Sequence, residues 1–209
     1  MRFHLPKIYP ITDRVLSGLS HLEQVKRLAA GGATLIQLRE KHLSPRKFFD
    51  DAQAAVEFAS QNQISLIIND RVDIALAAGA AGVHLGQDDM PPNLARKVLG
   101  ADAIIGYSTH SIGQANLAAT LPVDYLAIGP IFETQTKEDH DPVVGIEGLA
   151  LLGEAVGDMP IVAIGGIAAG DLAAVFASGA DSAAMISEII GDGEAIERIT
   201  RHLFALHAA

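Results

Sequence analysis

Aspartate residues follow two neighbouring apolar runs of the sequence. The run at residues 66–68 ends beside Asp70, and the run at residues 82–85 ends near Asp88 and Asp89. If both runs are parallel strands joined by a helix, their carboxyl ends lie side by side at one edge of a sheet. Two carboxylates that converge there suit a hard cation such as Mg²⁺, especially one shared with phosphate oxygens. The simpler alternative is that these aspartates cap helix N-termini.

A cationic segment, QLREK at residues 37–41, lies one apolar run earlier. Alternation along a strand places Gln37, Arg39 and Lys41 on one face and the two residues between them on the other. Two cations and an amide directed together at a strand end suit a polyanion such as diphosphate. An ordinary solvated charge cluster is the alternative.

Hydroxyl and glycine residues follow the later apolar runs. Gly166 belongs to a Gly-Gly turn, and Ser187 follows the last run. Backbone amides at such a turn, next to the end of the eighth strand, form the phosphate seat of many barrels. The hydroxyl of Ser108 could donate to a phosphate. His110 is a candidate acid or base, but a lone histidine after a strand is more often structural, and we predict that role for it.

The longest irregular segment runs from residue 129 to about residue 145. Irregular segments of this length are usually functional or mobile. It contains Thr134, Thr136 and Lys137, which would bind phosphate if the segment closes over the site. The alternative is a polar connection without a function of its own.

Apolar runs alternate with helix-like segments along the whole chain. One helix is expected to begin with Ser44 as N-cap and Pro45 at its first position, and another covers residues 196–206. Eight strands alternating with helices at a spacing of roughly 25 residues indicate an α/β protein, a single (β/α)8 TIM barrel. We expect one domain, residues 1–209, with the active site at the C-terminal ends of the strands; an open doubly wound sheet is the alternative. The expected strands are residues 8–11, 35–38, 66–68, 82–85, 104–107, 125–128, 160–164 and 183–186.

Composition narrows the classes of function. The 209 residues carry a formal net charge of −10 and no cysteine. The charge disfavours nucleic acid and anionic membrane as partners, and the lack of cysteine excludes disulfides, thiolate metal sites and thiol nucleophiles. No run is long and clean enough to span a bilayer, and the first ten residues lack the apolar core of a signal peptide, so we expect a cytoplasmic protein. A homo-oligomer is compatible with these features.

The motifs taken together resemble the thiamine-phosphate synthase family. They occur in the family's order and spacing and cover nearly the whole chain. The family fold is a TIM barrel, which agrees with the independent strand count. The matching segments are QLREK at 37–41, INDR at 68–71, GVHLGQDD at 82–89, GYSTH at 106–110, GPIFETQTK at 129–137, AIGGI at 163–167 and MIS at 185–187.

The resemblance implies a reaction and a set of residue roles. Enzymes of this family join 4-amino-2-methyl-5-hydroxymethylpyrimidine diphosphate to 4-methyl-5-(2-hydroxyethyl)thiazole phosphate, giving thiamine phosphate and diphosphate. The implied cofactor is Mg²⁺, held by Asp70 and Asp89, and the implied partners are the two phosphorylated heterocycles. By motif, the catalytic residues would be Arg39, Lys41, Ser108 and Lys137; the pyrimidine diphosphate would contact Gln37, Leu38, Arg39, Glu40, Lys41, Asn69, Ser108 and Lys137; and the thiazole phosphate would contact Thr134, Gln135, Thr136, Gly166, Ile186 and Ser187.

Two other functions compete with this one. The first is a thiazole tautomerase-like isomerase, whose relatives carry histidine at the position of Pro130 and lack the phosphate-binding lysines. The second is a non-catalytic barrel that binds a phosphate ligand and has no leaving group to stabilise. This chain has Pro130 and keeps Asp70, Lys41 and Lys137, which favours the synthase. It departs from the family pattern at Glu133, where proline or a small residue is common.

Overall fold

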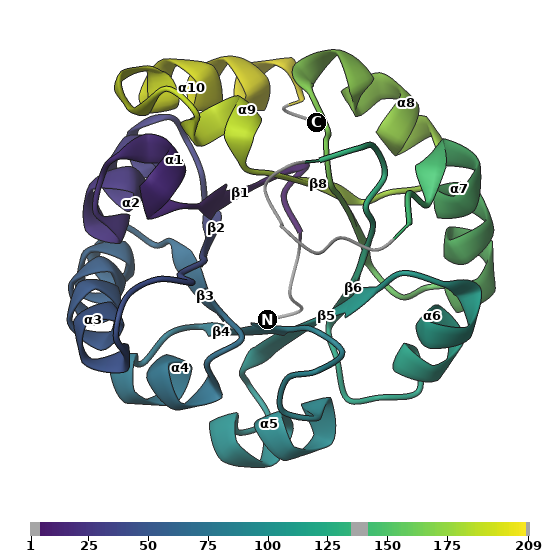
Figure 1. The fold of residues 1–209 in the computed structure, drawn as a ribbon, viewed down its shortest axis with the longest axis horizontal. Coiled ribbons are helices and arrows are strands. Elements are labelled where there is room, and N and C mark those ends of the chain that lie inside the picture. Colours follow the sequence, from purple (N-terminus) through teal and green to yellow (C-terminus); the bar gives the residue numbers. More distant parts are fainter. Residues whose placement is uncertain (1–4, 135–141, 208–209) are drawn as a thin grey trace.

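A closed barrel of eight parallel strands forms the centre of the molecule in the computed structural model, which describes residues 5–134 and 142–207 (Figure 1). Each strand pairs with the next, and β1 (Ile8–Thr12) pairs with β8 (Ser182–Met185). This closure confirms the predicted TIM barrel and excludes the open doubly wound sheet, whose edge strands stay unpaired. The other strands are β2 (Leu35–Leu38), β3 (Ser65–Asn69), β4 (Gly82–Leu85), β5 (Ile104–Thr109), β6 (Tyr125–Ile128) and β7 (Ile161–Ile164).

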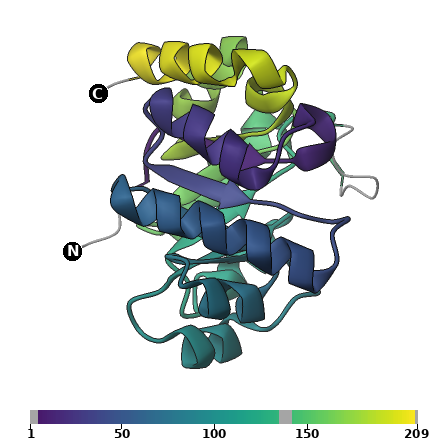
Figure 2. The same cartoon turned by 90° about the vertical axis from the view of Figure 1, so that its left-hand side faces the viewer.

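Helices form a ring around the strands. In the side view, α2, α3 and α10 lie next to one another on the outside of the barrel (Figure 2). None of the described helices is long and apolar enough to cross a membrane. The helices are α1 (Arg14–Ser17), α2 (His21–Ala30), α3 (Pro45–Gln61), α4 (Val72–Ala78), α5 (Pro92–Leu99), α6 (Ile112–Ala118), α7 (Gly145–Val156), α8 (Leu172–Ala177), α9 (Ser187–Ile190) and α10 (Ile196–Leu206), with 3₁₀ turns η1 (Ala169–Asp171) and η2 (Gly193–Ala195).

Local sequence signals predicted these elements closely. Every strand lies within two residues of its predicted bounds at each end. Ser44 is the N-cap of α3 and Pro45 its first residue, although the Ser44 side chain makes no capping hydrogen bond. One difference concerns a candidate site residue. Ile186 was expected to end the last strand, but it is the N-cap of α9.

The core has two layers, one on each face of the barrel wall. Side chains such as Ile67 and Val162 fill the interior, whereas Ile36 and Leu38 pack against the helices. Because successive strand residues point to opposite faces, Gln37 enters the barrel between these two outward-facing residues. Burial on both faces explains why the strands read as continuous apolar runs in the sequence.

Candidate active site

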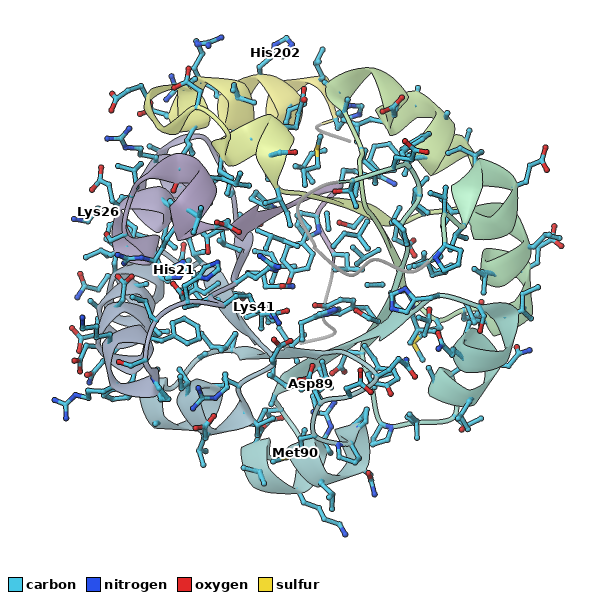
Figure 3. The ribbon with its side chains drawn as sticks, in the orientation of Figure 1. His21, Lys26, Lys41, Asp89, Met90 and His202 are labelled. Atoms are coloured by element: carbon cyan, nitrogen blue, oxygen red, sulfur yellow. The ribbon has the colours of Figure 1, made fainter. Side chains whose placement is uncertain are left out.

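Three charged side chains meet where β2, β3 and β4 end. The ammonium nitrogen of Lys41 lies 2.5 Å from Oδ2 of Asp70. Burial raises the pKa of the Asp89 carboxyl, the Gly86 amide opposes this shift, and the neighbouring Asp70 carboxylate adds to it. In Figure 3, Lys41 and Asp89 lie inside the ring of helices, whereas Lys26 points outward from it. The structure thus brings together the two acidic strand ends and one of the cations singled out from the sequence.

Backbone geometry holds the two carboxylates in place. Asp70 has a φ of +62°, in the left-handed region that a residue with a side chain seldom occupies, and its N–H donates to the carbonyl of His84 at 2.8 Å. Oδ2 of Asp89 accepts from the N–H of Gly86 at 2.7 Å. Neither aspartate is a helix N-cap, because the caps of α4 and α5 are Arg71 and Pro91. The capping alternative is therefore wrong.

The chemistry of Asp70 and Asp89 fits a hard divalent cation. Both offer oxygen donors, and the Asp70 carboxylate is near enough to Asp89 to add to the burial that raises the pKa of the Asp89 carboxyl. Within residues 5–134 and 142–207, no group of three or more His, Cys, Asp or Glu side chains is arranged to hold a metal. A site formed by Asp70 and Asp89 would supply two carboxylates and leave the other coordination positions to water and phosphate oxygens. Proteins usually bind Mg²⁺ in this way.

Arg39 is anchored at the mouth by a residue that the sequence did not single out. Its Nη1 donates to Oδ2 of Asp13 at 2.9 Å, and both side chains are largely buried. The other carboxylate oxygen of Asp13 accepts from the N–H of Val15 at 2.9 Å and caps α1. Asp13 therefore fixes the guanidinium relative to the end of β1. Only the fold brings these two residues together, because 26 positions separate them in the chain.

Leu38 and Glu40 point away from the barrel mouth. Leu38 is completely buried in the outer core. Oε2 of Glu40 lies 3.2 Å from Nε2 of His21, and its Oε1 accepts from the N–H groups of His42 and Leu43. The prediction that these two residues contact the substrate is therefore restricted to their backbone groups. The side chains of Gln37, Arg39 and Lys41 remain as the candidate ligands.

Glycines shape the opposite side of the mouth. Gly165 and Gly166 follow β7 with φ values of +102° and +66°. A Cβ at Gly166 would lie 2.4 Å from the carbonyl oxygen of Glu133 and 2.9 Å from Cβ of Phe132, so only glycine allows the two loops to approach this closely. The same cavity is lined by Arg39, Asn69, His84, Thr134, Gly166, Ile186 and Ser187. Gln135, Thr136 and Lys137 lie outside the described residues.

A row of hydrogen-bonded polar side chains crosses the barrel interior, and Gln37 and His84 of this row line the cavity. The Nε2 of Gln37 donates to the hydroxyl of Tyr9 at 3.3 Å, and the hydroxyls of Tyr9 and Tyr125 lie 3.1 Å apart. His84 joins Tyr125 to Ser108, with Nδ1 at 3.0 Å from the tyrosine hydroxyl and Nε2 at 2.9 Å from the serine Oγ. Burial lowers the pKa of His84 to about 4 and raises that of Tyr9 to about 12. The row is therefore uncharged at neutral pH.

The middle residues of this row were not predicted from the sequence. Tyr9, His84 and Tyr125 each stand at an inward position of an apolar strand, and that is the signal that could have revealed them. A polar side chain inside a barrel needs a partner there, because an unpaired buried polar group is costly. Three such residues on β1, β4 and β6 would have predicted an internal network.

His110 also reaches the cavity. Its Nδ1 lies 2.6 Å from the carbonyl oxygen of Gly129, which requires that nitrogen to carry a hydrogen, and its backbone N–H donates to Oε1 of Gln114 at 2.7 Å. The first bond ties the residue after β5 to the end of β6, and the second ties it to α6. They are the contacts expected of the structural histidine predicted from the sequence.

Comparison with known proteins agrees with this geometry. A family model described as thiamine monophosphate synthase matches residues 8–189. The thiamine-phosphate synthase of Clostridium novyi is 45% identical over 88% of this chain and 90% of its own, and that of Chloroflexus aurantiacus is 41% identical over 96% and 92%. The solved thiamine phosphate pyrophosphorylase of Pyrococcus furiosus superposes with a TM-score of 0.86 at 35% identity, covering 97% of this chain and 95% of its own. The chain belongs to the thiamine monophosphate synthase family.

Proposed function

We propose that the protein is a thiamine-phosphate synthase, a transferase that joins the pyrimidine diphosphate to the thiazole phosphate and releases diphosphate. The observation that carries this proposal is the arrangement of one barrel mouth, with an acidic pair and two cations on one side and a glycine-lined seat on the other. Two phosphorylated substrates need two such regions within reach of each other. We likewise propose that residues 1–209 act as one domain with this single mouth as the active site.

The pyrimidine diphosphate is assigned to the side of the mouth formed by β2, β3 and β5. Arg39 and Lys41 provide positive charge there, and Gln37 and Asn69 lie among the cavity walls beneath. Ser108 provides a hydroxyl at the end of β5. By family resemblance, Lys137, in the segment after β6, is a further ligand of the pyrimidine diphosphate. The backbone groups of residues 37–41 contribute the remaining contacts.

The thiazole phosphate is assigned to the side formed by β6, β7 and β8. Gly166 presents backbone close to the cavity, and Ser187 begins α9 beside it. Backbone N–H groups and a hydroxyl in this position suit the oxygens of a phosphate monoester. Thr134 faces the same cavity, and by resemblance Gln135, Thr136 and Ile186 complete the contacts.

Charge stabilisation is the principal catalytic effect that this site offers. The bond between the pyrimidinylmethyl carbon and the diphosphate oxygen breaks, and the thiazole nitrogen forms the new bond with its lone pair. Arg39, Lys41 and Lys137 bind the diphosphate as its negative charge develops, and Ser108 donates a hydrogen bond to it. Bound Mg²⁺, held by Asp70 and Asp89, would supply further charge neutralisation to the leaving group.

No general base is required by this chemistry. The attacking nitrogen becomes quaternary, so no proton leaves it. A tautomerase, in contrast, needs a group that moves protons, and the tautomerase relatives place histidine where this chain has Pro130. The site's two carboxylates and two cations also exceed what a purely binding protein requires, because binding alone leaves no leaving group to stabilise.

The test is direct synthesis. The purified protein is incubated with both substrates, with Mg²⁺ or with a chelator, and thiamine phosphate and diphosphate are measured. We expect Mg²⁺-dependent formation of both products in equal amounts and no reaction if either substrate is omitted. Lys41→Ala should lose activity, whereas Lys26→Ala, which removes an exposed lysine on the outer face of α2, should retain it. Isomerisation of a thiazole substrate without condensation would instead identify a tautomerase.

A further inference from the structure

A continuous chain of hydrogen bonds crosses the barrel floor beneath the mouth. It runs from Gln37 through Tyr9, Tyr125 and His84 to Ser108, with heavy-atom distances of 3.3, 3.1, 3.0 and 2.9 Å in that order. The three middle residues are at most 6% exposed. The chain therefore joins two residues assigned to the pyrimidine diphosphate through groups that the proposed chemistry does not itself use.

Gly106 makes room for the central bond of this chain. In the sheet register it lies between His84 on β4 and Tyr125 on β6. A Cβ at this position would lie 2.1 Å from Cζ of Tyr125 and 2.5 Å from Nδ1 of His84. The two rings instead stack across the glycine, with centroids 5.6 Å apart and planes inclined by 20°. The missing side chain is thus a condition for the contact between His84 and Tyr125.

One direction of the hydrogen bonds gives every hydroxyl hydrogen of this chain of bonds an acceptor. The amide nitrogen of Gln37 donates to Tyr9, so the single hydroxyl hydrogen of Tyr9 is available for Tyr125. Tyr125 then donates to Nδ1 of His84. A neutral imidazole that accepts at Nδ1 carries its hydrogen on Nε2, which must donate to Oγ of Ser108.

This direction determines what each end of the chain presents to a ligand. Because Ser108 accepts from His84, its own hydroxyl hydrogen is left to donate elsewhere. One N–H of the Gln37 amide is engaged with Tyr9, which leaves the carbonyl oxygen and the second N–H for the cavity. In the opposite direction Ser108 would donate to His84. The buried Tyr9 hydroxyl would then accept from both Gln37 and Tyr125 and would have no acceptor for its own hydrogen among the described residues, which is unfavourable.

We propose that Tyr125 and His84 are positioning residues that hold Ser108 as a hydrogen-bond donor to the diphosphate and the Gln37 carbonyl as an acceptor for the pyrimidine amino group. The assignment of these ligand groups rests on the proposed function. Tyr125 sets the imidazole tautomer without touching substrate, and the tautomer sets the orientation of the serine hydroxyl. Removing the Tyr125 hydroxyl releases the tautomer, so that part of the His84 population carries its hydrogen on Nδ1; in that part Ser108 donates to Nε2 and not to the diphosphate.

The kinetic test compares Tyr125→Phe with wild type. We expect kcat/KM for the pyrimidine diphosphate to fall on the order of tenfold or more, the scale for losing a buried hydrogen-bond partner, while KM for the thiazole phosphate stays unchanged. Tyr125→Phe should add little to the loss caused by Ser108→Ala, since both act through one hydroxyl. Ser182→Ala is the matched control. Like Tyr125→Phe it deletes a buried hydroxyl, but the Ser182 hydroxyl, on β8, has no hydrogen-bond partner among the described residues, so its loss should leave the kinetics unchanged.

The spectroscopic test needs no activity. Nitrogen-15 NMR of the histidine rings, with His84 assigned by comparison with His84→Gln, should show hydrogen on Nε2 in wild type and a mixture of the Nε2 and Nδ1 tautomers in Tyr125→Phe. If the variant does not fold, the wild-type spectrum still decides, and hydrogen on Nδ1 there overturns the proposal. Additive losses in the Tyr125→Phe, Ser108→Ala double variant, or a Tyr125→Phe enzyme within threefold of wild type, overturn it as well. An inactive wild-type protein with hydrogen on Nε2 would refute the synthase assignment and leave the direction of the hydrogen bonds from Gln37 to Ser108 intact.

Discussion

Asp70 and Asp89 show at the residue scale how the fold brings two carboxylates together without a local motif. The two residues are far apart in the sequence, and each is held by a backbone contact of its own. Bringing two carboxylates together is unfavourable unless a positive charge joins them. Lys41 supplies one such charge, and a divalent cation bound with diphosphate would supply more.

We predict that Asp70→Asn and Asp89→Asn each weaken Mg²⁺-dependent binding of the pyrimidine diphosphate much more than binding of the thiazole phosphate. Each substitution removes a charged oxygen donor while keeping the size of the side chain. Titration of activity against Mg²⁺ measures the effect, and Asp73→Asn, at an exposed site on α4 paired with Arg71, is the matched control. Equal Mg²⁺ dependence in wild type and both variants would refute the assignment.

His110 leads to the opposite prediction. It binds the Gly129 carbonyl through Nδ1, and a glutamine amide can also donate to that oxygen. A His110→Gln variant that folds normally should therefore keep kcat within about tenfold of wild type, well below the 10²–10⁴-fold contribution of a true general base. Single-turnover product formation at saturating substrate, from mildly acid to mildly basic pH, is the measurement. A thousandfold loss would instead indicate proton transfer and favour the tautomerase.

At the scale of elements, the site depends on how closely the ends of neighbouring strands approach. The segment after β6 lies against the turn after β7, where the N–H of Ile131 donates to Ile164 and that of Phe132 donates to Gly165, both at 2.9 Å. Gly166 sits in this contact with a positive φ. The seat proposed for the thiazole phosphate is therefore formed jointly by two loops.

We predict that Gly166→Ala raises KM for the thiazole phosphate and lowers the free energy of unfolding by about 1–3 kcal/mol, because its Cβ would meet Glu133 and Phe132 in a strained conformation. Gly170→Ala is the control, since a Cβ there meets nothing within 4 Å and its φ is not positive. Steady-state kinetics and denaturant unfolding of both variants test the prediction. Unchanged thiazole phosphate KM in Gly166→Ala would show that this turn does not shape the seat.

At the scale of the whole molecule, the barrel buries a histidine in its neutral form, which couples stability to pH. Burial lowers the pKa of His84 to about 4, although Asp70 opposes the shift. An unfolded chain would take up a proton on this residue below about pH 6.5. The unfolded state therefore binds more protons than the native state between these values, and stability falls as the pH drops through that window.

We predict that wild type loses more stability between pH 7 and pH 5 than His84→Gln does, by up to about 2 kcal/mol, since the substitution removes this proton uptake. Urea unfolding at the two pH values gives the difference directly. His202→Gln, at an exposed position on α10, should keep the wild-type pH dependence. Identical pH dependence in His84→Gln and wild type would mean that His84 does not titrate differently on unfolding.

The sequence by itself determined the barrel and the residues at its mouth. Continuous apolar runs mark strands buried on both faces. Most candidate site residues lie within a few positions of the end of such a run, which places them at the barrel mouth. Strand alternation also placed Gln37, Arg39 and Lys41 on one face. These are local properties, because the period of a strand and the position of its end depend only on neighbouring residues.

Only the tertiary structure decided which distant side chains meet. The pairing of Arg39 with Asp13, and the chain from Gln37 to Ser108, depend on the register between strands and on the space left by Gly106. Nothing in the local pattern around His84 or Tyr125 specifies the other as its partner. Closure of the barrel turns inward-facing positions of separate strands into neighbours, and that contact, rather than sequence proximity, sets their hydrogen bonds and protonation.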